Sequence, residues 1–492
     1  MSLLFTGGRV LTPGGYVDWA LVDAGTITAT GAAADEPRAE RTVDLDGAVL
    51  LPGFCDAHVH LPATGLYAAG MDFRGERSSR AILDAFAERA RQPDAILFGG
   101  NFEDPLDRPL TAALLDEAVG NRPALLARAD MHSCVVSTAL LQQLDVDEPT
   151  GYLREQDAAE AWRWFDASLP RTQQRDAIRA AVDLAYSKGV TCVHEMFVVE
   201  WRGWASLDVF QEAVADAALE IVLYVATDDV DRVREMGLPR IGGDYFLDGS
   251  FGSHTAWLSE PYSSPPPEGS PANGISYRDD GELLELFRAA QSWDLQMGVH
   301  AIGDAAIEQV ISAWEKVAAE TGEDGVRSLG HRIEHFECAS DDHIERAARL
   351  GLRASVQPAF DRYWGGTDGL YARRIGAERA LGMNRFGTMA SGGLGLGAGS
   401  DSTVTPLDPF LQMASLREHH VEAERVDPAT ALAMHTVGSR ELAGDPSAGV
   451  IAAGRRADLV LVDRDPLSVS VDELLETEVR GTWIGGERVW SA

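Results

Sequence analysis

The stretch Leu50-Leu-Pro-Gly-Phe-Cys-Asp-Ala-His-Val-His60 carries the strongest indication of fold and chemistry in this chain. It is apolar enough to form a buried strand, and it ends in two histidines two residues apart. Because side chains alternate along a strand, His58 and His60 point to the same face and can aim at one point beyond the strand end. Neutral imidazole is a preferred ligand of zinc and neighbouring transition metals. Two histidines often fall this close by chance, so a metal site needs support from the sequence that follows.

The centre of the chain alternates apolar runs with helix-like stretches, which is typical of a parallel α/β sheet. Eight such runs match the strand count of a (β/α)8 barrel, a fold that carries its chemistry at the C-terminal strand ends. We therefore expect a TIM-like barrel over residues 53–446. The expected strands are 53–60, 190–195, 220–226, 244–248, 295–300, 331–335, 352–357 and 395–400.

Both ends of the chain are divided by Gly and Pro turns into short β segments. We expect residues 1–52 and 447–492 to pair into one small flanking β-sandwich. Residues 62–185 separate the first two barrel strands by more than one crossover helix requires. They predict an insertion, with strands near 95–99 and 124–129, that forms a lid over the active face. A distal structural subdomain is the alternative.

The composition argues against several classes of partner. The chain has 492 residues, 45% of them hydrophobic, so it can bury a large core. Lys and Arg total 42 and Asp and Glu total 77, and the resulting formal net charge of −35 argues against nucleic acid and anionic membranes. We expect a small-molecule substrate as the partner, no nucleic acid and no membrane, and a homodimer as one open assembly.

The sequence favours a cytoplasmic protein. The first residues lack the charged and apolar regions of a signal peptide, and no apolar run approaches the roughly 18 residues of a membrane span. The cysteines are scattered and include no CxxC pair, which favours free thiols in a reducing compartment. They are Cys55, Cys134, Cys192 and Cys338.

Further metal-ligand side chains follow other expected strands. His300 ends the fifth, His335 ends the sixth, and Asp401 follows the eighth. Any one of them alone is more often a hydrogen-bonded structural group than a ligand. Five such residues at the C-terminal ends of barrel strands predict a metal centre. The expected ligands are His58, His60, His300, His335 and Asp401.

Several motifs resemble those of the amidohydrolase superfamily, and within it the YtcJ-like branch (amidohydrolase family 3) that includes N-substituted formamide deformylases. They are Pro52-Gly-Phe-Cys-Asp-Ala-His-Val-His60, Asp248-Gly-Ser-Phe-Gly-Ser-His-Thr-Ala256, Val299-His-Ala-Ile-Gly-Asp304, Arg332-Ile-Glu-His335, Ser355-Val-Gln-Pro358, Gly399-Ser-Asp-Ser-Thr-Val-Thr-Pro-Leu-Asp-Pro409 and Gly449-Val-Ile-Ala-Ala-Gly-Arg-Arg-Ala-Asp458. The resemblance implies a TIM-like barrel, a flanking β domain and metal-dependent hydrolysis. Met131-His-Ser-Cys-Val-Val-Ser137 resembles the segment of the insertion whose histidine faces the substrate, which implies that His132 contacts substrate.

The chain departs from this family pattern at one position. Many members have a lysine four residues before the Asp-Gly of the fourth strand, and its carboxylated form bridges two metals. Here that position is Asp244, and the only lysines, Lys188 and Lys316, are poorly placed to substitute. We therefore expect no carboxylated lysine. Asp244 or Glu195 could bridge as a carboxylate, one metal could bind alone, or Asp244 could be solvated and Glu195 salt-bridged.

The implied chemistry needs one or two divalent ions, with zinc the first expectation. Such an ion polarises a carbonyl and lowers the pKa of a bound water. The resemblance assigns Asp401 as the base that takes the water proton and passes it to the leaving nitrogen. In a one-metal site, His335 would orient water or stabilise the developing oxyanion.

Substrate contacts are less well specified by the sequence. Asp248 and Asp304 are expected to hold ligands or substrate, although Asp304 could instead cap the following helix. Trp257 is the expected aromatic contact, with Phe102, Tyr363 and Trp364 as further candidates. Packing at the surface or within the lid is the alternative for each aromatic side chain.

The function that fits these patterns is hydrolysis of an amide or N-formyl C–N bond in a small molecule. A metal-dependent deaminase of a heterocycle or a cyclic-amide hydrolase on the same scaffold is the enzymatic alternative. A metal-free barrel that serves as a binding or assembly protein is the non-enzymatic one. Metal analysis separates the last class from the other two, and ammonia release identifies a deaminase.

Overall fold

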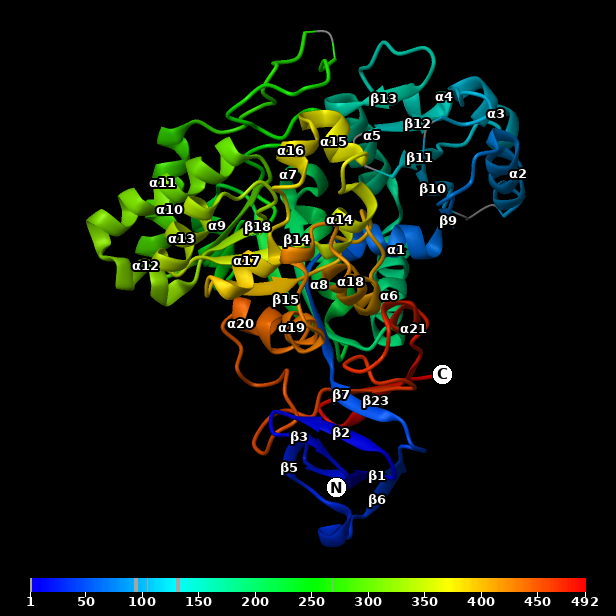
Figure 1. The fold of residues 1–492 in the computed structure, drawn as a ribbon. Coiled ribbons are helices and arrows are strands. Elements are labelled where there is room, and N and C mark those ends of the chain that lie inside the picture. The colour runs from blue at the N-terminus through cyan, green and yellow to red at the C-terminus, as the bar shows by residue number, and fades with distance from the viewer. Residues whose placement is uncertain (1, 93–95, 104, 130–132, 268) are drawn as a thin grey trace.

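The structure is a computed structural model that describes residues 2–92, 96–103, 105–129, 133–267 and 269–492. Its centre consists of parallel strands in two sheets, ordered β15-β14-β8 and β16-β17-β18-β19-β20. Helices surround these strands (Figure 1). The strands are β8 (Phe54–Val59), β14 (Val190–Val198), β15 (Glu220–Ala226), β16 (Arg240–Ile241), β17 (Gln296–Ala301), β18 (Arg332–His335), β19 (Arg353–Val356) and β20 (Gly395–Ala398).

Backbone hydrogen bonds join the edges of the two parallel sheets. The Asp401 N–H donates to the His58 carbonyl at 2.8 Å, and Val59 forms a parallel bridge with Ser402. At the other edge, the Gly242 N–H donates to the Val225 carbonyl at 2.8 Å. The C-terminal ends of β8 and β20 therefore lie side by side although they are far apart in the sequence.

The helices that flank these strands have regular caps in several places. Asp279 caps α10 through the N–H groups of Gly281 and Glu282, and Asp408 caps α18 through those of Phe410 and Leu411. The main flanking helices are α1 (Leu61–Ala69), α6 (Arg171–Ser187), α8 (Trp204–Val214), α9 (Val230–Glu235), α10 (Asp280–Ser292), α11 (Asp304–Thr321), α12 (Glu323–Leu329), α13 (Asp341–Leu350), α14 (Pro358–Trp364), α15 (Leu370–Ile375), α17 (Phe386–Ser391), α18 (Pro409–Arg417), α19 (Pro428–Met434) and α20 (Val437–Leu442).

The expected strand 244–248 is wrong in its bounds. The regular strand, β16, ends at Ile241, and Gly242 and Gly243 follow with φ of 80° and 79°. A Cβ at Gly242 would lie 2.1 Å from the Gly298 carbonyl oxygen, so only glycine allows this close approach. Pairing resumes as one bridge between Phe246 and His300. The other expected strands are present, with bounds shifted by a few residues.

Strands from both chain ends form a separate β region. One sheet has the order β23-β22-β21-β7-β2-β3, and a second has the order β5-β4-β1-β6. Phe5 and Trp483, one from each sheet, pack edge to face at 5.2 Å, and both termini lie in this region (Figure 1). The strands are β1 (Leu3–Thr6), β2 (Arg9–Thr12), β3 (Gly15–Val17), β4 (Trp19–Asp23), β5 (Thr26–Gly31), β6 (Arg41–Asp44), β7 (Val49–Pro52), β21 (Leu459–Val462), β22 (Val479–Ile484) and β23 (Glu487–Ser491).

The segment between β8 and β14 contains a sheet of its own, ordered β13-β12-β11-β10-β9 (Figure 1). Its strands β10 (Phe98–Phe102) and β11 (Leu125–Arg128) overlap the two expected there. The other elements are β9 (Met71–Asp72), β12 (Ser133–Val136), β13 (Tyr152–Arg154), α2 (Ser79–Ala90), α3 (Ala112–Val119), α4 (Thr138–Leu141) and α5 (Glu155–Ser168). Among the helices that the structure describes, none has the length and apolar character needed to cross a membrane.

The burial of one histidine in the core predicts that the free energy of unfolding depends on pH. His331 is fully buried, stacks on Trp314 with 3.7 Å between ring centroids, accepts the Met297 N–H at Nδ1 and faces the Gln291 amide oxygen with Nε2. Burial holds this ring neutral and lowers its pKa to about 3. The unfolded chain, with a histidine pKa near ~6.5, therefore binds more protons than the folded protein below that pH.

Stability from this group is complete above pH ~6.5 and is lost as the pH falls toward 3. We expect His331 alone to reduce the free energy of unfolding by about 2 kcal/mol between pH 7 and pH 5. Denaturant titrations at both pH values measure the loss, and His331→Gln should show a smaller difference than the wild type. Equal pH dependence in the two proteins would contradict the prediction.

Candidate metal centre

The structure brings the five expected metal ligands together at the C-terminal ends of the parallel strands. Asp401 Oδ1 lies 3.6 Å from His58 Nε2 and 3.2 Å from His60 Nε2. The ring centroids of His58 and His335 are 4.9 Å apart, and those of His300 and His335 are 4.4 Å apart. These distances bring the five side chains into one cluster.

Hydrogen bonds on the far side of three of the rings direct Nε2 toward the centre, whereas His300 faces Asp244 with Nδ1. His60 Nδ1 donates to the Met196 carbonyl at 2.9 Å, and His58 Nδ1 donates to Glu334 at 3.0 Å. His335 Nδ1 donates to the Gln357 amide oxygen at 2.7 Å. Because Nδ1 is the donor in these bonds, Nε2 is the atom that each of the three rings would offer to a metal.

One atom of this cluster supplies a test of whether a metal fits. His58 Nε2 is buried and has no hydrogen-bond partner among the described residues. Buried nitrogen atoms without a partner are rare because the lost hydrogen bond to water is not replaced. A divalent ion among His58 Nε2, His60 Nε2 and Asp401 Oδ1 would satisfy this atom with the nitrogen and oxygen ligands that zinc accepts. The donor set therefore fits a divalent metal.

Asp244 lies between the two groups of histidines, whereas Glu195 does not. Asp244 Oδ2 is 3.5 Å from His60 Nε2, and Oδ1 is 3.0 Å from His300 Nδ1 and 3.5 Å from His335 Nε2. The Glu195 carboxylate instead accepts the Leu61 backbone N–H at 2.7 Å, at the start of α1. Glu195 is absent from the ligand clusters found among the described residues, as is His300, so the place of Glu195 beside a metal stays a prediction.

The carboxylates dominate the electrostatics of the cluster. Burial alone would lower the pKa of His60, but Asp401 and Asp244 raise it to about 9. The pKa of Asp401 falls below its usual value because the nearby histidines outweigh burial, and Asp244 is lowered further by His300 and His335. The site therefore concentrates negative charge in a buried position, where a cation is favoured.

Two residues of the cluster have an unusual backbone. Asp401 and His335 have φ of 50° and 71°, in the left-handed region that non-glycine residues rarely adopt. The bond from the Asp401 N–H to the His58 carbonyl helps to hold this conformation. Such conformations cost free energy and are concentrated at functional sites.

Three residues that were expected to contact substrate make other contacts. They are Asp248, Asp304 and Trp257. Asp248 is fully buried and accepts the backbone N–H groups of Trp257, Ile302 and Gly303 at 2.8–3.0 Å, while its Oδ1 lies 3.6 Å from His300 Nε2. It thus fixes the loops beside a ligand and is not among the described residues that line the cavity.

Asp304 and Trp257 are likewise absent from the described lining of the cavity. The Asp304 carboxylate accepts the N–H and the hydroxyl of Ser259, and α11 has Gly303 rather than Asp304 as its N-cap. Both the expected substrate contact and the capping alternative for Asp304 are therefore corrected. His132 lies outside the described residues.

A cavity of about 480 Å³ opens above the cluster. His60, Asp244, His300, His335 and Asp401 line it, together with an aromatic wall and residues of the 62–185 segment. Of the expected aromatic residues, Tyr363 and Trp364 line the cavity, whereas Phe102 and Trp257 are absent from its described lining. The wall is formed by Trp162, Trp201, Phe246, Phe251, Phe360, Tyr363, Trp364 and Tyr371, and the segment 62–185 contributes Ala63, Glu103, Arg128, Ala129, Ala159, Trp162, Arg163 and Asp166.

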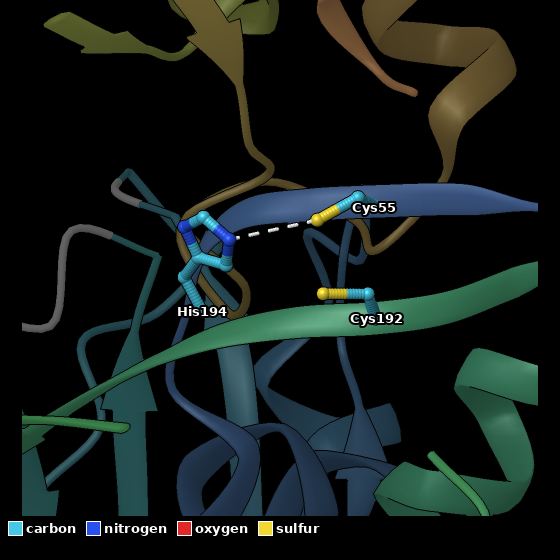
Figure 2. Close-up of side chains that lie close together, drawn as sticks. All are labelled: Cys55, Cys192 and His194. Carbon is cyan, nitrogen blue, oxygen red and sulfur yellow. Dashed lines mark hydrogen bonds between the residues drawn. The ribbon is translucent and has the colours of Figure 1, made fainter. Parts of the chain in front are cut away.

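A second group of ligand-type side chains lies within the parallel strands. Cys55 and Cys192 are partners on β8 and β14, and their sulfur atoms lie near His194 (Figure 2). His194 Nδ1 accepts from the Arg332 guanidinium at 2.6 Å, so the neutral ring carries its proton on Nε2, 3.6 Å from Cys55 Sγ. Burial also raises the pKa of the Cys55 thiol well above its usual value. A protonated Nε2 and a neutral thiol are poor ligands, so we interpret this group as hydrogen-bonded structure.

Arg332 and Glu334 support the candidate metal centre, a role that was not predicted from the sequence. Glu334 accepts from Arg332 Nε and Nη2, each at 2.8 Å, and from His58 Nδ1. Arg332 and Glu334 are fully buried on one face of β18. The Arg-Ile-Glu-His motif could have predicted this pairing, because alternation along a strand places Arg332 and Glu334 on the same face.

Similarity to known proteins extends over nearly the whole chain. A family model described as the amidohydrolase family matches residues 41–490. YtcJ of Bacillus subtilis (strain 168), named as an amidohydrolase, is 29% identical, covering 100% of this chain and 99% of that protein. The N-substituted formamide deformylase of Arthrobacter pascens is 27% identical, covering 99% of this chain and 94% of that protein.

A solved structure of a hydrolase is also similar to this chain. The crystal structure of an uncharacterized metal-dependent hydrolase from Pyrococcus furiosus aligns with a TM-score of 0.78 and 27% identity, covering 95% of this chain and 100% of that one. The family match spans most of the chain and includes every residue of the candidate metal centre. The protein therefore belongs to the amidohydrolase family and is a hydrolase.

Proposed function

We propose that this protein is a divalent-metal hydrolase that cleaves an amide or N-formyl C–N bond of a small molecule. The observation that carries the proposal is the buried His58 Nε2, which has no hydrogen-bond partner among the described residues and faces Asp401. Asp401 and His60 line the cavity. The hydrogen bonds between the edges of the two parallel sheets support a closed (β/α)8 barrel, and the sheets of the chain ends support a flanking β-sandwich. The relative named as an N-substituted formamide deformylase supports the choice of bond.

The residues that would hold the metal form two overlapping groups. His58, His60 and Asp401 form one, and His58, Asp244 and His335 form the other. His300 contacts Asp244 at 3.0 Å, and Asp244 would supply a carboxylate oxygen if a second ion bound. A bound divalent ion would polarise the substrate carbonyl and lower the pKa of a water. Zinc is the first choice because the donor atoms are imidazole nitrogens and carboxylate oxygens.

Asp401 handles the proton in this mechanism. Its carboxylate borders the cavity and is only 6% exposed, so it has few competing water contacts. It accepts a proton as the water oxygen bonds to the carbonyl carbon, and it delivers that proton to the nitrogen as the C–N bond breaks. The products are a carboxylic acid, formate in the case of a formamide, and an amine. His335, held by Gln357, orients water or stabilises the developing oxyanion.

Metal content tests the site independently of the substrate. We expect protein purified without chelator to contain a divalent ion, predominantly zinc, because His58 and His60 both present Nε2 to one point. A chelator should abolish activity and lower Tm, and zinc should restore both. Elemental analysis measures the content in the wild type and in His58→Asn, which should lose metal.

His420→Asn is a matched control, because this histidine is 40% exposed and contacts Asp361 rather than the cluster. It should retain the wild-type metal content. Protein that contains no divalent metal when purified in this way would contradict the proposed site.

The bond that is cleaved is tested by identifying the products. Incubation with N-formyl amines, acylamides and cyclic amides should release an amine with formate or another carboxylate from at least one of these classes. Release of ammonia from a heterocycle instead would show that the deaminase alternative holds. Turnover by metal-free protein would reject the proposed mechanism.

A further inference from the structure

A buried carboxylate in the cavity wall has no role in the mechanism above. Glu337 follows His335 by two residues, is 3% exposed, and borders the same cavity as His335 and Asp401. His335 and Phe336 both have positive φ, so the chain turns sharply between the strand and Glu337. The position of this carboxylate is therefore set by an uncommon backbone conformation beside the metal centre.

Polar atoms around Glu337 are only weakly satisfied, and only by one another. Glu337 Oε2, the Tyr371 hydroxyl and Asn384 Nδ2 are all buried without a hydrogen bond of normal geometry among the described residues. Tyr371 borders the cavity with Glu337, and the Asn384 N–H donates to the Glu337 carbonyl at 2.8 Å. The Tyr371 hydroxyl interacts with both Glu337 and Asn384, but these contacts fall short of normal hydrogen-bond geometry, so each of the three groups keeps unused hydrogen-bonding capacity. A polar group that enters from the cavity could form a hydrogen bond of normal geometry with Glu337.

The surroundings of Glu337 and Tyr371 are aromatic. Tyr371 packs against Phe251 at 5.2 Å and against Trp364 at 6.4 Å, and Phe360 packs against Trp364 at 4.8 Å. Among the charged neighbours of Glu337, His335 has the largest effect, and Asp248 and Asp401 add negative charge. An oxygen acceptor among aromatic faces and other carboxylates favours a group that donates N–H bonds and carries positive charge.

We propose that Glu337 and Tyr371 form a subsite that selects substrates by binding an amine group. The inference rests on the proposed function and narrows its substrate class to amides whose body carries a second, N–H-donating nitrogen such as a primary ammonium. Glu337 accepts the N–H bonds, and the Tyr371 ring packs against the adjacent carbon atoms. The subsite binds the substrate and leaves the proton transfer to Asp401.

Equilibrium binding of two probes to the metal-loaded protein tests the subsite. Benzylamine, an ammonium donor at neutral pH, is compared with benzyl methyl ether, which has a similar ring but only an acceptor. Calorimetry or quenching of tryptophan fluorescence should give about a tenfold or greater preference for benzylamine. Glu337→Leu should lose this preference and bind the ether as the wild type does. Tyr371→Phe should retain a reduced preference.

Glu337→Gln and the control Glu424→Gln make the test specific. Glu337→Gln keeps an oxygen acceptor without the charge and should show an intermediate preference. Glu424 is also a buried carboxylate, but it accepts from Thr388 outside the described cavity lining, so its variant should keep the full preference. If Glu337→Leu does not fold, as judged by circular dichroism, Glu337→Gln and Tyr371→Phe decide the question.

The outcomes separate this inference from the proposed hydrolysis. Equal binding of both probes by the wild type, or an unchanged preference in the folded Glu337 variants, would overturn the subsite. Neither measurement requires turnover, so an amine preference in a protein that cleaves no amide would reject the proposed function alone. Hydrolysis without amine preference would reject the subsite alone.

Discussion

The Asp401→Asn variant is expected to lose about a hundred- to ten-thousand-fold in kcat while it keeps its fold. Asparagine preserves the size of the side chain but cannot accept the proton of the attacking water. Asparagine is also among the residues that best tolerate positive φ, so the backbone at φ 50° can be retained. The substitution therefore removes the proton acceptor with little change in shape.

The measurement combines kinetics with metal analysis, because Asp401 is also a candidate ligand. The informative result is a folded variant that still contains metal and has lost turnover on a substrate that the wild type cleaves. Asp304→Asn is the matched control, since Asp304 bonds to Ser259 away from the described cavity lining. Activity of Asp401→Asn within a few-fold of the wild type would show that another group takes the proton.

The clustering of the candidate metal ligands was largely predictable because parallel strands place their C-terminal ends together. Alternation along β8 places His58 and His60 on one side, and His300, His335 and Asp401 end or follow other strands. Sequence alone left Asp244 undecided, because its role depends on three histidines from other strands. The structure supplies those distances.

Glu195 shows why counting along a strand is not enough to place a side chain. β14 pairs with β8 through two register shifts, one of them between Val193 and Glu195. A bulge of this kind changes the side that the following residues face, so placement at a strand end no longer implies placement in the site. Gly242 and Gly243 interrupt the fourth strand in a comparable way. Such irregularities arise from close backbone contacts between strands, which one strand's sequence does not report.

The Arg332→Met variant is expected to lose about 3–5 kcal/mol of unfolding free energy. Arg332 is fully buried, and each of its N–H donors has an acceptor within the parallel strands. The acceptors are both Glu334 oxygens and the Ala57 carbonyl at 2.8 Å, His194 Nδ1 at 2.6 Å and the Tyr224 hydroxyl at 3.3 Å. Removing the guanidinium leaves the Glu334 carboxylate buried with His58 as its remaining side-chain partner.

The same variant should weaken metal binding about ten- to a hundred-fold, because Glu334 holds the His58 ring. Denaturant unfolding and metal titration measure the two effects. The double variant Arg332→Met with Glu334→Gln removes both charges, so it should recover much of the lost stability without recovering full metal affinity. Arg288→Met breaks an exposed ion pair with Glu320 and should change stability far less. If Arg332→Met had the same unfolding free energy as Arg288→Met, this would contradict the prediction that the buried Arg332–Glu334 pair stabilises the structure around His58.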